Sequence, residues 1–274
     1  MSEINQALTP IKSAIISTSC KDGIDVIAKY LASHGVLIYS TGETAKYLKS
    51  IGVTTTSVES LTEFPEMLGG RVKTMHPKVL GGILARRDKK SDIKEITKHG
   101  IPSIDLVIID LYPFEETVEN NSSHEDILES IDIGGSTLIR AAAKNYHDVL
   151  VVSDRSQYDA LMEVLGEECA SDLHSREEFA IEAFAKTFEY DKMIFKYLLA
   201  EDEDQIESDG NSSDSNINLN LSVTKDDYNL NDFIYCWEKF GERPNKIVVY
   251  NSYSTKLFNK LMEDKILSKN VFTE

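Results

Sequence analysis

The chain has 274 residues, which is enough for one large domain or two ordinary ones, and 41% of them are hydrophobic, as in soluble globular proteins. Its formal net charge of -17 argues against binding nucleic acid or an anionic membrane through overall charge, although a small anion would feel only the local field of its pocket. The three cysteines are far apart and fit neither a metal site nor a disulfide framework, which favours a reducing compartment. Residues 1–10 lack an apolar signal core, and no apolar run approaches the roughly 20 residues of a membrane helix. We therefore expect a cytoplasmic protein without a metal.

Apolar runs and helical patterns alternate over the first 153 residues. Strands are predicted at 13–19, 36–40, 53–58, 104–111 and 148–153. Helices are predicted at 23–34, 43–51, 124–131 and 136–144. This alternation predicts an α/β fold with a parallel sheet covered on both faces, and such sheets bind ligands beyond the carboxyl ends of their strands.

The remaining chain has a different character. Helical patterns occupy 158–165 and 176–199, and residues 201–216 then hold seven acidic and no basic residues, which predicts a disordered linker. The segment 217–274 has a possible strand at 246–250 and a helix at 253–262, and it is marginal in length for a domain of its own. We therefore divide the chain into a domain at 1–200, a linker at 201–216 and a short segment of unknown role at 217–274.

The segment 69–78 concentrates positive charge in an otherwise acidic chain. Arg71, Lys73, His76 and Lys78 can hold an anion, and the two glycines that precede them let backbone N–H groups approach it. The plain alternative is a solvated surface loop.

Two strand–helix junctions carry hydroxyl groups. Lys21 follows Ser19 after the first predicted strand, which indicates an anion cradle, or else a helix that Ser19 caps. The second junction reads Thr41-Gly42-Glu43-Thr44. It suits a phosphate at a helix N-terminus, but the Glu43 carboxylate would repel phosphate unless it points away or only favours the helix dipole.

Three further residues can carry protons. Asp132 lies between two isoleucines, so it is either a buried carboxylate with a shifted pKa or a helix cap. Lys144 follows three alanines and can turn into a cleft or remain solvated. Tyr112 follows a buried strand and can donate a hydrogen bond at a site, or lie in the core with a satisfied hydroxyl.

Four motifs together resemble one family. GGRVKTMHPKVLGGIL, DLYPF, IDIGGSTLIRAAAKN and FPEMLGGR closely resemble the IMP cyclohydrolase domain of the bifunctional AICAR transformylase/IMP cyclohydrolase family, from about Lys12 to about Leu199. The resemblance implies a methylglyoxal-synthase-like α/β/α sandwich, here with extra C-terminal helices and a short α+β tail. It also implies a hydrolase acting on cyclic amidines. This enzyme closes 5-formamidoimidazole-4-carboxamide ribotide (FAICAR) to IMP with loss of water, the last step of de novo purine synthesis, without a cofactor.

The resemblance also implies roles for individual residues. The expected catalytic set is Lys73, Tyr112, Asp132 and Lys144. The two lysines would donate protons or stabilise an oxyanion, the other two would relay protons, and His76 would orient or tune Lys73. The residues expected to bind FAICAR or IMP are Ser19, Lys21, Thr41, Gly42, Thr44, Arg71, Thr74, Asp110, Ile133 and Gly134. A homodimer is a further expectation from the family.

Two departures from the family keep an alternative open. Glu43 stands where the family usually has a second glycine, and the arginine–tyrosine–glycine and asparagine–proline–histidine signature of the transformylase half is absent. A separate formylating enzyme would then have to supply FAICAR. The alternative is a catalytically idle protein that binds a purine nucleotide or a partner. Methylglyoxal synthase chemistry is a weaker possibility, because fold alone does not set function.

Overall fold

The computed structural model describes residues 8–68, 71–120, 122–208, 218–219, 246–249 and 272–273, with side chains up to residue 199. The chain divides into two compact units, Met1–Leu199 and Ala200–Glu274. The predicted strand at 246–250 corresponds to β9 (Lys246–Val249), which pairs in parallel with β8 (Asn218–Leu219) and β10 (Phe272–Thr273) in the second unit. The helix predicted at 253–262 lies outside the described residues.

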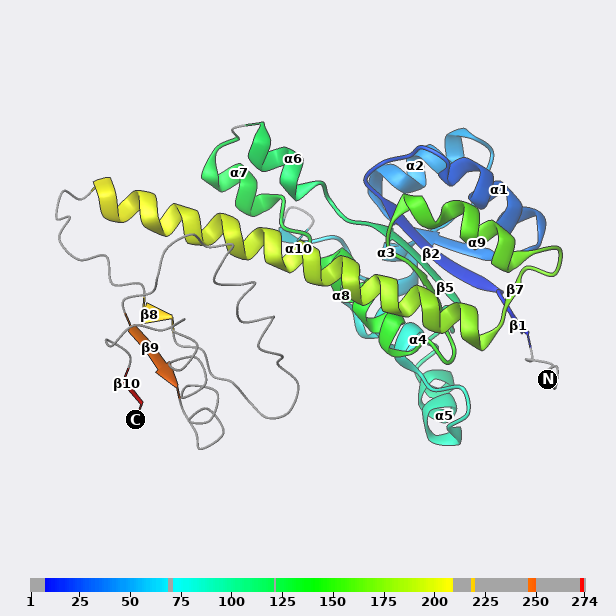
Figure 1. Cartoon of the computed structure of the whole chain (residues 1–274). Helices are drawn as coiled ribbons and strands as arrows, with labels where there is room; N and C mark the ends of the chain where they lie inside the picture. Colours follow the sequence, from blue (N-terminus) through cyan, green and yellow to red (C-terminus); the bar gives the residue numbers. More distant parts are fainter. Residues whose placement is uncertain are drawn as a thin grey trace. The chain divides into compact units, whose positions relative to one another are not determined.

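A five-stranded parallel sheet forms the centre of the first unit (Figure 1). Its order is β4-β3-β2-β5-β6, and its strands are β2 (Ser13–Thr18), β3 (Leu37–Ser40), β4 (Thr56–Ser57), β5 (Leu106–Asp110) and β6 (Leu150–Val152). Side chains of β2, β5 and β6 are almost entirely buried, because helices cover both faces and the strands are continuously apolar. A separate antiparallel pair joins β1 (Thr9–Pro10) to β7 (Ala170–Ser171).

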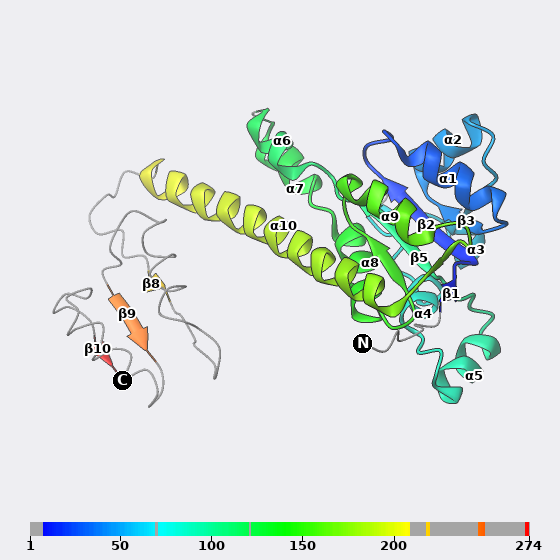
Figure 2. The same cartoon turned by 45° about the vertical axis from the view of Figure 1, so that its right-hand side comes forward.

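The helices connect these strands and cover the sheet. They are α1 (Ile24–Ser33), α2 (Gly42–Ser50), α3 (Val58–Thr62), α4 (Pro77–Leu84), α5 (Lys90–Lys98), α6 (Phe114–Glu119), α7 (His124–Glu129), α8 (Ile133–Lys144), α9 (Tyr158–Leu165) and α10 (Leu173–Ser208), with a short 3-10 turn at Arg155–Gln157. Right-handed connections leave β2 and β5 in opposite directions, so α1 and α8 lie on opposite faces of the sheet (Figures 1 and 2). This is the predicted α/β architecture.

Two predictions are wrong in their extent. The strand predicted at 53–58 shrinks to Thr56–Ser57, because the Ser57 side chain accepts a hydrogen bond from the Ser60 N–H and starts α3. The predicted disordered linker is helical up to Ser208, since α10 propagates through good helix formers such as glutamate, and residues 209–216 lie outside the described residues.

Within the described part of the chain, no helix is both long and apolar enough to cross a membrane.

Candidate active site at the strand ends

The strand order predicts a ligand crevice at the carboxyl ends of β2 and β5. Connections leave these neighbouring strands in opposite directions, and open α/β sheets bind ligands at such a point, beyond the carboxyl ends. Ser19, just after β2, donates a hydrogen bond of 2.7 Å to the Asp110 carboxylate at the end of β5, and the Cys20 N–H donates to the same oxygen at 3.0 Å. The alternative that Ser19 caps α1 is wrong, because the N-cap is Gly23 and makes no side-chain cap bond.

The start of α2 is open toward this crevice. The Thr41 side chain does not cap the helix but shares a hydrogen bond of 2.9 Å with Ser17, so the start of α2 has no side-chain cap among the residues that the structure describes. Lys21 lies beside them, with its Nζ 3.1 Å from Thr44 Oγ1 and also bonded to the Thr18 carbonyl. Burial lowers the pKa of Lys21, since its ammonium is partly desolvated. A helix N-terminus with a desolvated cation suits a phosphate.

Glu43, in the first turn of α2, has its carboxylate in solvent. Its side chain is 78% exposed and pairs with Lys46, with 2.6 Å between Oε1 and Nζ. That hydrogen bond holds the pKa of Glu43 below its usual range. The carboxylate is therefore exposed to solvent and paired with Lys46 rather than buried at the helix end.

The segment 71–76 brings Lys73 to the start of α2. A Cβ atom built on Gly42 would lie 3.9 Å from Lys73 Nζ, so the ammonium is next to the open helix end. Lys73 Nζ also lies 3.2 Å from the carboxylate of Glu66. An antiparallel bridge pairs Met67 with Val72. Glu66 precedes Met67 and Lys73 follows Val72, so the bridge sets Glu66 and Lys73 opposite each other.

The other cations of this segment have different partners. Arg71 is exposed and forms an ion pair with Glu129 in α7. Lys78 pairs with Glu63 at 3.0 Å. His76 caps α4, since its Nδ1 accepts a hydrogen bond of 3.1 Å from the Lys78 N–H. In the structure Glu66 directly contacts Lys73, and the orienting role of His76 stays a prediction.

Asp132 is a helix cap and a desolvated carboxylate at once. It precedes α8 and accepts a hydrogen bond of 2.6 Å from the Gly135 N–H. Burial raises the pKa of Asp132, although hydrogen bonds from the backbone N–H groups of Gly135 and Tyr112 oppose that rise. A Cβ atom on Gly135 would lie 2.4 Å from Asp132 Oδ2, so only glycine fits there. The two explanations of Asp132 are therefore compatible.

Further residues join these parts into one site. Tyr112 follows β5 and is 56% exposed, so it is not the core tyrosine of the alternative explanation, and its backbone contacts Asp132. A Cβ atom on Gly134 would meet Thr74 Oγ1 at 3.0 Å, which places the segment after Lys73 against the start of α8. Ile133, in the first turn of that helix, is exposed.

Lys144 lies at the opposite end of α8 from Asp132. It ends α8, twelve residues long, whereas Asp132 precedes the same helix, so roughly 17 Å of helix axis separates the two ends. The helix leads from the carboxyl edge of β5 back to the amino end of β6, and Lys144 is exposed there. The structure therefore unites Lys73, Tyr112 and Asp132 but not Lys144, whose catalytic role remains a prediction from the resemblance.

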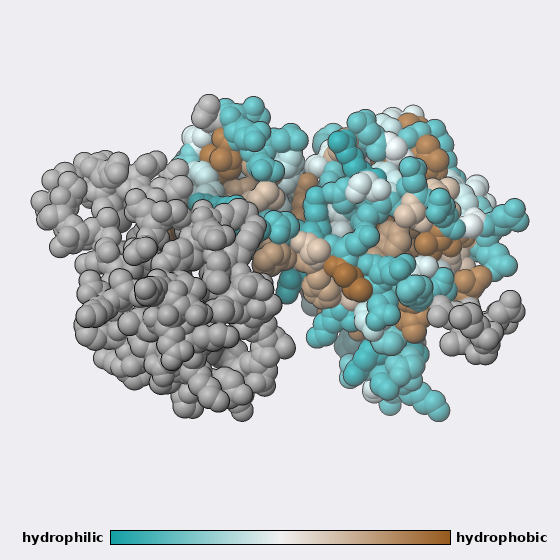
Figure 3. Space-filling model, viewed as in Figure 1, coloured by the Kyte–Doolittle hydropathy of each residue, from teal (hydrophilic) through white to brown (hydrophobic). Residues whose placement is uncertain are grey.

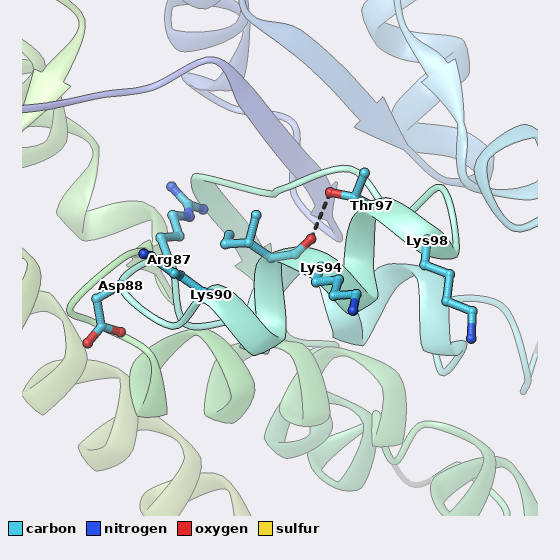
Figure 4. Close-up of a pocket in the computed structure, with 7 residues that line it drawn as sticks. Arg87, Asp88, Lys90, Lys94, Thr97 and Lys98 are labelled. Carbon is cyan, nitrogen blue, oxygen red and sulfur yellow. Dashed lines mark hydrogen bonds between the residues drawn. The ribbon is translucent and has the colours of Figure 1, made fainter.

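A hollow of about 600 Å³ on α5 contains none of the predicted site residues. Figure 4 shows Lys90, Lys94 and Lys98 spaced along this helix, with Thr97 donating a hydrogen bond to the Ile93 carbonyl at 2.7 Å. Arg87 at its edge is bound to Asp105 at 2.5 Å. This surface is separate from the crevice, and among the described residues no cluster of histidine, cysteine and acidic side chains could hold a metal.

Sequence reasoning missed Glu66, although a signal was present. Glu66 and Lys73 lie symmetrically about a Leu-Gly-Gly-Arg turn, which is the pattern of a short hairpin. The Arg71 N–H bonds the Leu68 carbonyl at 3.3 Å and closes that turn. A hairpin prediction at this point would have paired the carboxylate with the lysine.

The sheet order and the open helix end define the class of protein. Residues 23–137 match the family model described as an MGS-like domain, and residues 142–228 match that of the AICARFT/IMPCHase bienzyme. The chain belongs to the AICARFT/IMPCHase family and carries its MGS-like domain.

Similar proteins support this assignment. The bifunctional purine biosynthesis protein PurH of Bacteroides thetaiotaomicron is 52% identical over 188 residues, which are 68% of this chain and 37% of that protein. PurH of Clostridioides difficile is 46% identical over 193 residues, 70% of this chain and 38% of that protein. The crystal structure of ForH has 32% identity and a TM-score of 0.60, covering 69% of this chain and 97% of that one. The chain thus spans little more than a third of the length of these PurH relatives.

Proposed function

We propose that the chain is an IMP cyclohydrolase that closes FAICAR to IMP with loss of water. The observation that carries this proposal is that neighbouring residues reach two helix starts: Lys73 lies at the open N-terminus of α2, and Thr74 lies at the start of α8, which the desolvated Asp132 caps. A cation, a carboxylate with a raised pKa and an anion site in one crevice are what a proton-moving step on a nucleotide needs. The chain's membership of the AICARFT/IMPCHase family supports the same reaction.

The phosphate of the substrate would bind at the start of α2. Free N–H groups and the Lys21 ammonium offer positive charge there, and the helix dipole adds to it. Ser19 and Asp110 bridge β2 and β5 beside this point and would contact the ribose or the base. Thr74 and Gly134 would close the opposite side, where α8 begins.

Ring closure is mainly a problem of orientation and proton transfer. The carboxamide nitrogen attacks the formyl carbon of the same molecule, and the site must hold the two groups face to face. The Lys73 ammonium would stabilise the negative charge that develops on the formyl oxygen. Asp132 would accept a proton from the attacking nitrogen, and the Tyr112 hydroxyl would pass protons toward the oxygen.

The proton balance fits this arrangement. A carbon–nitrogen bond forms, the carboxamide nitrogen gives up one proton and the formamide nitrogen another, and both leave with the formyl oxygen as water. No electron acceptor is needed, and the product is the purine ring. One basic group and one acidic group at the same crevice therefore suffice.

Replacing Glu43 by glycine should change nucleotide binding little. The carboxylate is in solvent and paired with Lys46, so its repulsion of a phosphate is screened. We expect Glu43→Gly to alter the dissociation constant of IMP by less than about threefold at physiological salt. Lys21→Ala is the contrasting variant and should weaken IMP roughly tenfold or more, because it removes a charge-assisted contact. Titration calorimetry measures both, and strong tightening by Glu43→Gly would contradict this placement.

Glu66→Gln should lower turnover while leaving nucleotide binding intact. Glu66 positions the Lys73 ammonium and faces no predicted phosphate contact. We expect kcat to fall roughly tenfold to a hundredfold, with the dissociation constant of IMP within about twofold of wild type. Glu66→Asp should recover part of the rate. Glu63→Gln is the matched control, since Glu63 pairs with Lys78 outside the crevice. Equal losses in both variants would contradict a positioning role.

The second candidate function is an idle protein that binds a purine nucleotide, and it is motivated by Glu43, which stands where the family usually has a second glycine. Purified chain should convert FAICAR to IMP without added metal or folate if the proposal holds. Protein that is folded and binds IMP by calorimetry but shows no turnover would instead support the idle protein. An Asp132→Asn preparation from the same host controls for contaminating host enzyme.

A further inference from the structure

A basic surface on α5 lies at the opposite edge of the sheet from the candidate active site. Arg87, which lines the hollow on this helix, pairs with Asp105 at 2.5 Å and donates a hydrogen bond of 2.8 Å to the Ile104 carbonyl. Asp105 directly precedes β5 and accepts a hydrogen bond of 2.8 Å from the N–H of Lys12, which directly precedes β2. The hollow is therefore anchored at the amino ends of these two strands, whereas the candidate site lies at their carboxyl ends.

Three lysines of this surface form a row without acidic partners. Residues 86–98 hold six cations and three acidic residues, in a chain whose net charge is -17. Lys90, Lys94 and Lys98 recur every four residues, about 6 Å apart along the helix axis, and Figure 4 shows Lys94 and Lys98 extending from the same side of α5. Within the described part of the chain, none of the three forms an ion pair. Like charges at this spacing repel each other and destabilise a helix, so negative charge brought to this lysine row would stabilise it.

The three acidic residues of this segment leave the lysine row unneutralised. Asp88 pairs with Lys89 at 2.8 Å, and Asp92 pairs with Arg86, also at 2.8 Å. Hydrogen bonds within these pairs hold the pKa of both aspartates below its usual range, so both carboxylates stay charged and engaged. The third acidic residue, Glu95, directly follows the middle lysine of the row, which places it about 100° away around the helix. The lysine row therefore keeps its positive charge.

The helix α5 lies at the periphery of its unit, away from the sheet, in both Figures 1 and 2. None of its nine residues is buried, and a helix of this length without packing is marginal in water. Figure 3 shows mostly hydrophilic surface where this helix lies. Ile93 lines the hollow and is 37% exposed, and the buried Nε of Arg87 has no hydrogen-bond partner among the described residues. A partner that packs on this side would therefore stabilise the helix.

We propose that this surface binds an acidic helical segment of a partner protein. A helix with glutamate or aspartate at every fourth position presents carboxylates about 6 Å apart, the interval at which the three lysines recur. An apolar side chain beside that acidic row would contact Ile93 and the methyl group of Thr97, which also line the hollow. Matched rows of opposite charge speed the encounter of the two helices and fix their register.

The length of the lysine row favours a short acidic segment over a nucleic acid. About 12 Å of helix axis separates Lys90 from Lys98, so the row matches about two helical turns of a partner. The negative charge of a nucleic acid continues beyond such a row, where the net charge of -17 opposes it. A protein segment can place its carboxylates opposite the lysines alone.

Fluorescence anisotropy on the full chain tests the proposal with two labelled peptides of the same composition. In the patterned peptide, glutamates occupy every fourth position and leucines lie beside them. In the scrambled peptide, the glutamates are spread around the helix. Wild type should bind the patterned peptide at least about tenfold more tightly than the scrambled one, and added salt should weaken this binding, because the contact is electrostatic.

Charge reversal along the lysine row supplies the decisive variant. Lys90→Glu, Lys94→Glu and Lys98→Glu combined should weaken binding of the patterned peptide at least about tenfold. Its affinity in the control variant should stay within about threefold of wild type, because that variant has the same net charge but an intact row. The control variant reverses three exposed helical lysines elsewhere, namely Lys29→Glu, Lys49→Glu and Lys196→Glu. Circular dichroism confirms that each variant is folded.

A third peptide tests charge complementarity by gain of binding. With lysines in place of its glutamates, the patterned peptide should bind the variant with the reversed row more tightly than it binds the control variant. Three results would overturn the proposal: a wild type that binds neither acidic peptide or both equally, a reversed row that binds the patterned peptide as tightly as the control does, or a single-stranded oligonucleotide of equal charge that binds more tightly than that peptide. The reaction at the strand ends is not involved, so failure of either proposal leaves the other standing.

Discussion

Lys73→Ala should lower turnover of FAICAR by roughly a hundredfold to a thousandfold, the loss that follows removal of a group stabilising a developing oxyanion. Lys73 is the cation that the structure places at the open start of α2, and Glu66 fixes it there. Steady-state kinetics should show the loss mainly in kcat, with a smaller rise in KM, since Lys73 also lies beside the helix end at which Lys21 would hold the phosphate.

Two lysine variants serve as controls for this prediction. Lys78→Ala removes a cation of the same segment whose partner is Glu63, and it should keep near wild-type turnover. Lys144→Ala removes the lysine at the far end of α8, and its effect should be at least about tenfold smaller than that of Lys73→Ala, because contact with the transition state is needed for a large loss. Equal losses of turnover in Lys73→Ala and Lys144→Ala would contradict this prediction. They would show that two lysines far apart in the structure act together.

Asp132→Asn should abolish most of the turnover and also stabilise the protein. The variant removes the proposed proton acceptor, which we expect to cost roughly a hundredfold to ten-thousandfold in kcat. Asparagine is as good a helix cap as aspartate, so the hydrogen bond from the Gly135 N–H survives. The burial that raises the pKa of Asp132 disfavours its charged form, and asparagine carries no charge to desolvate.

The pH dependence of stability follows from the raised pKa of Asp132. A carboxyl whose folded pKa is raised favours folding below its unfolded pKa, and this contribution is lost as the pH rises through the folded pKa. The melting temperature of Asp132→Asn should therefore exceed that of wild type at neutral pH, and the difference should close toward about pH 4. Differential scanning calorimetry measures it. Asp126→Asn is the control, a capping-region carboxylate in α7 outside the crevice, and a variant Asp132→Asn that melts lower at neutral pH would contradict the account.

Much of the fold followed from the sequence because the strands are long apolar runs. The segments that became β2, β5 and β6 bury almost every side chain, and such continuous runs separated by helical patterns specify a covered parallel sheet. The extent of β4 could not be predicted, because the Ser57 cap competes with the strand. The helix α5 was missed because its apolar side consists only of Ile93 and Ile96, neither of which is buried.

Within the candidate site, the sequence alone predicted only the residues that lie at the carboxyl ends of strands. Ser19, Thr41 and Asp110 each follow a strand, and parallel strands bring their carboxyl ends to one edge. The contact between Glu66 and Lys73 was missed because it depends on the register of a short hairpin that the sequence analysis did not predict. The distance of Lys144 from Asp132 is set by helix length, which a motif does not show.

The most direct measurement is the rate at which purified chain forms IMP from FAICAR, followed by absorbance, with IMP affinity determined on the same preparation. We predict turnover in wild type without metal or folate, loss of that turnover in Lys73→Ala and Asp132→Asn, and retained IMP binding in Asp132→Asn. A folded wild-type protein that binds IMP but forms none, or turnover that survives both substitutions, would contradict it.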